Sequence, residues 1–182
     1  TDADAEPSLQ TLLLALETYG ESPTDGWEQE LMEKCLSLFE QHQRAAVHSA
    51  AELLLQRLGY RAESQEVKQR LVRSDPCKGS DWYVNRQGLT MIVIAPPQRI
   101  TMGSSAAETE REIIETQRSV DIDYSFAISA HEVTIEQFRR FDGLFEYSPP
   151  VSPSPLCPIN NVTWYDGARY CRWLSECEKI SE

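Results

Sequence analysis

The first eighty residues carry apolar side chains at intervals of three and four, the spacing that lines one face of an α-helix. Four helices are predicted in turn: one opening at Pro7, one beginning near Gly26, one over residues 44–58 and a weaker one over residues 63–72. Helices this short bury their apolar faces only against neighbours. The sequence therefore predicts a helical domain over residues 1–80. The inward residues expected in the first three helices are Leu9, Leu12, Leu13, Leu16, Leu31, Cys35, Leu38, Phe39, Val47, Ala50, Ala51, Leu54 and Leu58.

Beyond a turn-rich boundary at residues 74–80, the apolar residues come in short runs. A strand is predicted over residues 90–95, stopped by two prolines, and a second over residues 100–102. Residues 104–116 are polar and are expected to form a loop with one helical turn. Residues 120–128 alternate apolar and polar, which indicates one half-buried strand.

Two helices of the second part begin with a capping box, in which a threonine bonds the backbone three residues on and that residue bonds back. Thr134 with Gln137 opens the first helix, and Thr163 with Asp166 opens the second. A proline-rich loop over residues 147–158 leads toward the second helix. The inner-face residues predicted for these helices are Ile135, Phe138 and Phe141, then Ala168, Cys171, Trp173 and Leu174.

Several short motifs follow one another along residues 81–182. They are Met91-Ile-Val-Ile, Met102-Gly-Ser, Phe126-Ala-Ile with Glu132-Val-Thr, Gln137-Phe, Cys157-Pro-Ile-Asn, and Val162-Thr-Trp-Tyr-Asp through Trp173-Leu-Ser. In this order they resemble the N-terminal part of the domain of the formylglycine-generating enzyme (sulfatase-modifying factor) family. Residues 46–59 resemble the second helix of a HEAT-type repeat. The two parts together resemble modular, planctomycete-type bacterial proteins.

The resemblance implies a fold class and a chemistry. The fold is α+β: a HEAT-like helical segment over residues 1–80, then a partial C-type-lectin-like domain over residues 81–182. Members of the family use copper and a pair of cysteines to oxidise a sulfatase cysteine to formylglycine, and relatives use histidines and a carboxylate on iron. Those residues lie in the C-terminal half of the domain, and no position here matches them. No catalytic, cofactor-binding or metal residue is therefore assigned, and copper or iron is expected only in a full-length enzyme.

The chain ends at Glu182, where the second half of such a domain is expected to begin. Roughly half a core cannot cover the apolar face of the last helix, so that face is expected to lie against a protein partner or the rest of the parent chain. The predicted function is a non-catalytic binding or scaffold fragment, with regulatory proteolysis as one origin. Two alternatives stay open: the N-terminal half of a metal-dependent oxidase truncated before its catalytic residues, and sugar or peptide recognition by a lectin-like fold.

Charge and composition restrict the classes of partner that this chain is expected to bind. The net charge is −12, and it divides equally, −6 for residues 1–80 and −6 for residues 81–182. Such a surface repels phosphate backbones, so a nucleic-acid partner is not expected. No apolar run approaches the ~20 residues of a membrane helix. The five cysteines, Cys35, Cys77, Cys157, Cys171 and Cys177, are an odd number without close pairing, which favours a reducing cytoplasm over a disulfide framework.

Several residues invite a chemical interpretation, but a structural one is preferred for each. Cys171 and Cys177 are six residues apart, about 240° around a helix, which disfavours a redox or metal pair. The histidines His42, His48 and His131 lack metal-ligand spacing. Asp121 and Asp123 could act as paired acids, but strand alternation places both toward solvent.

A structural role is also expected for the proline-rich loop and for the tryptophans. Five of the ten prolines fall in the loop, with two PxxP spacings, so a stiff, extended surface connection is expected rather than a ligand for proline-binding domains. Asn161 matches a glycosylation acceptor, but Thr163 is better explained as a cap. Trp164 and Trp173 lie about 180° apart around a helix, so they form no single stacking platform. Trp173 is expected in the core, and the place of Trp164 stays open.

Overall fold

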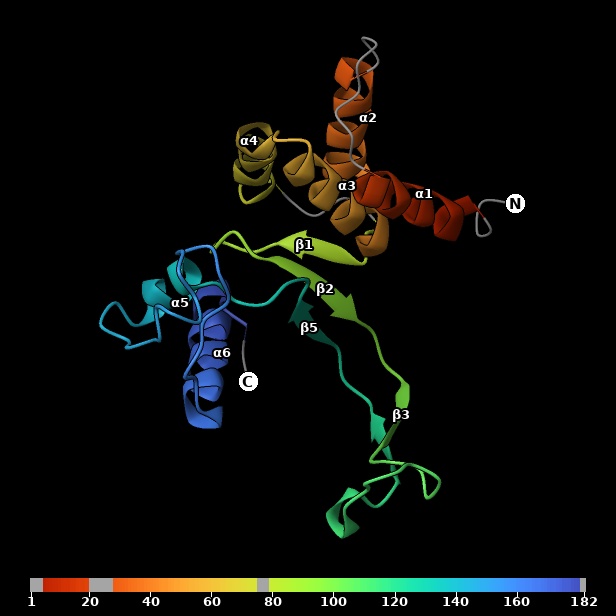
Figure 1. The fold of residues 1–182 in the computed structure, drawn as a ribbon, viewed down its shortest axis with the longest axis vertical. Helices are drawn as coiled ribbons and strands as arrows, with labels where there is room; N and C mark the ends of the chain where they lie inside the picture. The colour runs from red at the N-terminus through yellow and green to blue at the C-terminus, as the bar shows by residue number, and fades with distance from the viewer. Residues whose placement is uncertain (1–4, 20–27, 75–78, 181–182) are drawn as a thin grey trace. The chain divides into compact units, whose positions relative to one another are not determined.

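The computed structural model describes residues 5–19, 28–74 and 79–180, which form helices and short antiparallel strands (Figure 1). The predicted helix start near Gly26 and the thiol of Cys77 lie outside the described residues. Two compact units are present: one combines Thr1–Ile92 with Ser129–Glu182, and the other is Val93–Ile128. The α+β class is confirmed. The predicted domain boundary between residues 80 and 81 stays a prediction, as does the HEAT-like character of the helices.

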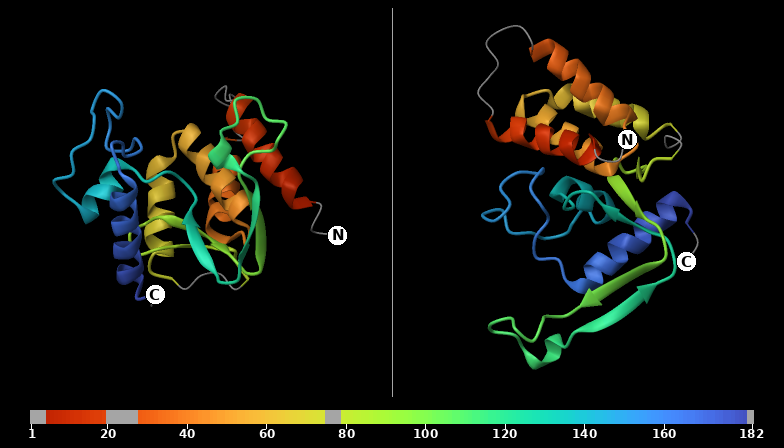
Figure 2. Two further views of the ribbon diagram at one scale, coloured as in Figure 1. Left: turned by 90° about the horizontal axis from the view of Figure 1, so that it is seen from below. Right: turned by 90° about the vertical axis from the view of Figure 1, so that its right-hand side faces the viewer.

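Four helices open the first unit, as predicted. They are α1 (Ala5–Tyr19), α2 (Glu28–Gln41), α3 (Ala45–Arg57) and α4 (Arg61–Leu71). α3 packs against α1 and α2, and α4 packs against α2 and α3; Figure 2 shows the four grouped together. The buried core of this group consists of Leu13, Cys35, Phe39, Val47, Ala50, Ala51, Leu54, Leu55 and Val67.

Two leucines differ from the predicted helix faces. Leu12 is 56% exposed although an inward position was predicted, and its neighbour Leu13 is buried instead. Successive residues of a helix point about 100° apart, so both could not face α3. Leu55 is fully buried and was not predicted. α3 has helices on more than one side, so more than one of its faces is covered.

A three-stranded sheet follows, with the strand order β1-β2-β5. β1 (Trp82–Val84) pairs antiparallel with β2 (Thr90–Ile94), and β5 is Phe126–Ser129. A tight turn joins the first two strands: Asn85 donates its N–H to the Leu89 carbonyl, and its side-chain oxygen accepts the Leu89 N–H. Gly88 in this turn has φ +77°, a conformation that favours glycine. β1 was not predicted from the sequence, because three residues are too few to show a period.

The second unit is built on a two-stranded antiparallel pair, β3 (Gln98–Met102) with β4 (Arg118–Ile122). The connection contains the short helix η2 (Ile113–Glu115), in agreement with the predicted helical turn. Gly103 turns the chain after β3 with φ +91°, and a Cβ there would lie 2.7 Å from the Glu115 carbonyl oxygen. The glycine of the Met-Gly-Ser motif is therefore required by a close backbone approach.

The single strand predicted over residues 120–128 was wrong, because the structure divides it into β4 and β5. The register pairs Gln98 with Ile122, so the next positions of the partner strand are Pro97 and Pro96. Proline has no N–H to donate, and the ladder stops there.

The two helices α5 (Ile135–Phe141) and α6 (Trp164–Glu178) confirm both predicted capping boxes. The Thr134 hydroxyl accepts the Gln137 N–H, and the Gln137 side chain accepts the Thr134 N–H. Thr163 and Asp166 form the same reciprocal pair at α6. These bonds satisfy N–H groups that a helix start would otherwise leave unpaired.

A buried histidine joins α3 to the sheet within the first unit. His48 lies between the rings of Phe39 and Trp82, at centroid distances of 4.5 Å and 3.5 Å. Its Nδ1 lies 2.6 Å from the Phe39 carbonyl oxygen and its Nε2 lies 3.3 Å from Oγ1 of Thr90. A carbonyl can only accept, so Nδ1 carries the proton. Burial lowers the pKa of His48 to about 4, against the opposing effects of the Phe39 carbonyl and the Glu52 charge.

Candidate functional site

The start of α6 presents two large aromatic side chains to solvent. Trp164 is 79% exposed and Tyr165 is 74% exposed. Their rings meet edge to face, with centroids 5.3 Å apart. The capping box of Thr163 and Asp166 fixes the backbone of this first turn. The structure therefore places Trp164 at the surface, on an ordered helix start.

The opposite side of α6 packs into an aromatic cluster. Tyr170 is buried and stacks on Phe138 of α5 at a centroid distance of 5.1 Å. Trp173 is half-buried, and its ring lies 5.6 Å from that of Tyr170. The predicted inner face was wrong at Ala168 and Cys171, which are exposed. Both lie 100° or more around the helix from Tyr170, the residue that faces α5.

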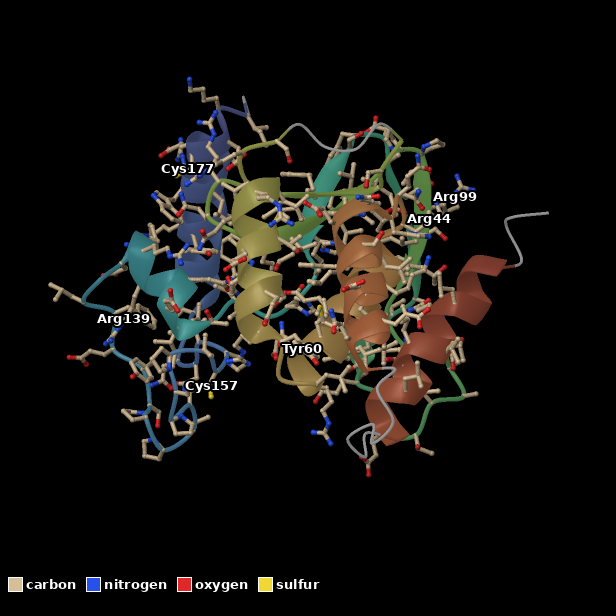
Figure 3. All side chains as sticks on the ribbon, turned by 90° about the horizontal axis from the view of Figure 1, so that it is seen from above. Arg44, Tyr60, Arg99, Arg139, Cys157 and Cys177 are labelled. Atoms are coloured by element: carbon tan, nitrogen blue, oxygen red, sulfur yellow. The ribbon has the colours of Figure 1, made fainter. Side chains whose placement is uncertain are left out.

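The described cysteines are free thiols in separate places. Cys157 belongs to the loop before α6 and Cys177 to the last turn of α6, and both are half-buried (Figure 3). Cys171 is exposed, not buried as predicted. Cys35 is buried as predicted, and burial raises its pKa to about 11, so the thiol stays protonated. Within residues 5–19, 28–74 and 79–180, no three His, Cys, Asp or Glu side chains gather as metal ligands would.

The three histidines each have their own neighbours. His42 accepts the backbone N–H of Arg44 on Nδ1 at 3.1 Å. His48 is enclosed by aromatic rings, as described above. His131, two residues after β5, lies with its Nε2 3.5 Å from an oxygen of Glu52.

The two aspartates belong to the second unit and both are exposed, as predicted. Asp121 accepts two hydrogen bonds from the Arg99 guanidinium across the β3–β4 pair, at 2.6 Å and 3.0 Å. This contact lowers the pKa of Asp121. Asp123 lies beyond the end of β4. The sequence did not show the Arg99 partner, because the strand register decides it.

The Glu-Val-Thr motif before α5 and the Cys-Pro-Ile-Asn motif after it lie side by side. Ile135 donates its N–H to the Cys157 carbonyl at 3.0 Å, and Ile159 donates to the Val133 carbonyl at 2.9 Å. The Glu-Val-Thr and Cys-Pro-Ile-Asn motifs are thus joined by backbone bonds. A family model described as the sulfatase-modifying factor enzyme 1-like domain matches residues 83–178, more than half of the 182 residues. The chain belongs to the sulfatase-modifying factor family. No curated protein and no solved structure matches it.

The sulfatase-modifying factor domain runs from β1 to the last residue of α6. It contains the exposed aromatic pair, the aromatic cluster and the whole of the second unit. The family resemblance predicted from the order of the motifs is confirmed. Among the described helices, none is both long and apolar enough to cross a lipid bilayer.

The proline-rich loop of the domain is folded back on itself rather than extended. Asn160 accepts the Ser148 N–H at 2.7 Å and donates to the Ser148 carbonyl at 3.1 Å. Ser152 is buried, and its hydroxyl donates to the Pro158 carbonyl. The predicted extended form was therefore wrong, because side-chain bonds close the loop into turns. An SH3-type ligand would need the open polyproline conformation.

One group of charged residues that adjoins the sulfatase-modifying factor domain could not be predicted from the sequence. Glu52 of α3 has a side chain that is only 2% exposed, and its Oε1 lies 2.6 Å from Nζ of Lys68 on α4. Its Oε2 faces His131, and Gln56 donates to Oε1 at 3.2 Å. Burial raises the pKa of Glu52, but His131 and the Lys68 charge outweigh it, and the pKa falls to about 2. The signal in the sequence was a lone glutamate beside the apolar positions of α3.

Proposed function

We propose that this chain is a non-catalytic protein-binding or scaffold element of the sulfatase-modifying factor family, and that Trp164 and Tyr165 anchor its partner. The observation that carries the proposal is their joint exposure, 79% and 74%, at one helix start. Exposing two adjacent rings of this size to water is unfavourable in free energy, and burial against another protein would remove that cost.

The local geometry supports a role for the two rings as a binding anchor. The capping box of Thr163 and Asp166 orders the turn that carries both rings, so little conformational entropy is lost when they bind. Tryptophan and tyrosine are the residues most enriched among those that dominate binding energy at interfaces. The partner we propose is a protein, not nucleic acid or membrane, and the charge of −12 favours a basic surface around its pocket. The proposal places the chain in a reducing cytoplasm, which fits five cysteines without close pairing.

Photo-cross-linking tests the proposal. A benzoylphenylalanine in place of Tyr165 is expected to form a discrete protein adduct in an extract of the source cells. Trp164→Ser in the same chain is expected to reduce that adduct at least tenfold, because the neighbouring ring carries much of the contact. The adduct would be measured by gel shift and identified by mass spectrometry.

Tyr124 supplies a matched control, since it is another exposed tyrosine, 64% exposed, in the second unit. The same cross-linker at Tyr124 should give no such adduct. Equal adducts from both positions would show non-specific capture and would reject the aromatic pair as an anchor, as would an adduct that Trp164→Ser leaves unchanged.

Family membership favours a second candidate, the N-terminal half of a metal-dependent oxidase that uses copper or iron. The described residues do not fit either metal, because no three potential ligands gather in them. We therefore expect the 182-residue chain, incubated with Cu(I) or Fe(II) and then desalted, to retain far less than one metal ion per chain. It is also expected to consume no oxygen in the presence of a thiol. Stoichiometric retention together with oxygen consumption, measured by elemental analysis and an oxygen electrode, would favour the oxidase and overturn the non-catalytic proposal.

A further inference from the structure

A cleft of about 1000 Å³ lies within the first compact unit, apart from Trp164 and Tyr165. α3 and α4 supply one side of it, and the β1–β2 turn, α5 and the end of the proline-rich loop supply the other. The ion pair of half-buried Lys68 with buried Glu52 lines it. The cleft therefore lies between the helices that precede the matched domain and the domain itself.

α4 lines the cleft with a row of long polar side chains. Arg61, Gln65, Gln69 and Arg73 succeed one another at intervals of four, so the first three lie along one face of the helix and Arg73 follows in the turn just after its end. Both arginines are exposed, and neither forms an ion pair with a side chain in the described part of the chain. Two guanidinium groups are thus available, about 18 Å apart along the helix axis at ~1.5 Å per residue.

The opposite wall holds two more arginines in fixed positions. Arg140 of α5 donates to the Gln87 carbonyl at 2.7 Å and to Glu136 at 3.1 Å. Arg86 in the β1–β2 turn donates to the Cys177 carbonyl at 3.2 Å. These bonds leave further N–H groups on each guanidinium, which carries five. Both guanidinium groups are therefore held in position and keep N–H groups that a ligand could accept.

The charge of the cleft is opposite to that of the chain. Its walls hold five basic side chains, Arg61, Lys68, Arg73, Arg86 and Arg140, against three acidic ones, Glu52, Glu132 and Glu136. The whole chain carries −12. At physiological salt, charges more than ~8 Å away are largely screened, so the cleft's own excess of two positive charges decides what enters it.

We propose that this cleft binds an acidic peptide segment of about six residues in extended conformation. Six residues at ~3.3 Å each span the distance between Arg61 and Arg73. Carboxylates would pair with the arginines in bidentate fashion, and the side chains of Gln65 and Gln69 offer both donors and acceptors to a peptide backbone. The exposed apolar side chains of Leu53 and Leu156 line the same cleft and would contact aliphatic stems.

A phosphate polymer fits this cleft less well than a peptide does. Among the described residues that line it there is no Phe, Tyr or Trp, so the imidazole of His131 is the single ring on which a base could stack. Its three carboxylates would also repel a continuous phosphate backbone more than they would repel a peptide with spaced charges. The peptide site is independent of the aromatic pair at the start of α6, which gives the chain two different binding surfaces.

Fluorescence anisotropy with a fluorescein-labelled hexaglutamate peptide tests the inference on the 182-residue chain. Saturable binding is expected at pH 7 and 0.15 M salt, weakening as salt rises to 0.5 M. The double variant Arg61→Glu, Arg73→Glu should bind at least tenfold more weakly. A matched double variant, Arg57→Glu with Arg118→Glu, makes the same charge change at exposed positions outside the cleft and should stay within twofold of the unaltered chain.

Four outcomes overturn the inference: no binding of hexaglutamate, equal losses in the two double variants, tighter binding of hexalysine, or tighter binding of a twelve-nucleotide single-stranded RNA. Circular dichroism checks that each variant keeps its helices. The Arg61→Glu, Arg73→Glu chain should keep the photo-cross-link at position 165. The proposal for the cleft and the proposal for the aromatic anchor are therefore tested separately.

Discussion

Acidification from pH 6.5 to pH 4.5 is expected to remove about 2 kcal/mol from the free energy of unfolding, because His48 takes up a proton readily in the unfolded chain but not in its buried aromatic site. The ring is fully buried between Phe39 and Trp82. Its pKa is about 4 in the folded chain, against the ordinary value of 6.5 expected when unfolded. Between these values the unfolded chain binds more protons, so stability falls as pH falls. The contribution is fully present above pH 6.5.

The measurement is urea unfolding followed by circular dichroism at pH 7, 6, 5 and 4.5, compared between the unaltered chain and His48→Gln. Glutamine can donate to the Phe39 carbonyl but does not titrate, so its stability should change much less over this range. The buried carboxylate of Glu52 also contributes stability that is lost on acidification, but its window runs from pH 4.5 to about 2, so it does not affect the comparison at pH 4.5 and above to the same extent as His48. An NMR titration of the folded chain should find the His48 ring neutral at pH 5.5. A ring pKa near 6.5, or an equal pH slope in His48→Gln, would contradict the prediction.

Phe138→Ala is expected to cost about 3–5 kcal/mol, because it empties the centre of the aromatic cluster. Phe138 is 2% exposed, and its ring meets those of Phe141, Phe145 and Tyr170 at 5.6, 4.8 and 5.1 Å. Removing the ring takes away three aromatic contacts and leaves a cavity that α5 and α6 cannot close without moving. The loss would be measured as a lower midpoint in urea unfolding at pH 7.

Leu144→Ala is the matched control for Phe138→Ala. Leu144 lies just after α5 and is 91% exposed, so its removal should change stability by no more than about 0.5 kcal/mol. Phe138→Leu keeps most of the buried volume and should cost less than Phe138→Ala, which gives a reading if the alanine variant fails to fold. A cost below 1 kcal/mol for Phe138→Ala would show that the cluster is not a packed core.

The features that the sequence predicted correctly are those that depend on near neighbours along the chain. Thr134 with Gln137 and Thr163 with Asp166 form capping boxes whose partners are three residues apart, so the amino acids alone specify them. The helices fall close to their predicted positions for the same reason, since periodicity is a local property. The order of the family motifs identified the domain, because each motif is a contiguous stretch.

The features that needed the tertiary structure depend on partners far away in the chain. His48 is buried and neutral because Phe39 and Trp82 close over it, and no spacing in the sequence shows that sandwich. Cys171 is exposed and Tyr170 buried because α5 lies on one side of α6, a choice that helical periodicity leaves open.

The cleft shows this division most clearly. A charge of −12 and the list of motifs were fixed by composition and local order. Five basic side chains from three separate segments, α4 with its following turn, the β1–β2 turn and α5, line one cleft. Only the tertiary structure brings them together, and the sign of a local field depends on which residues share a neighbourhood.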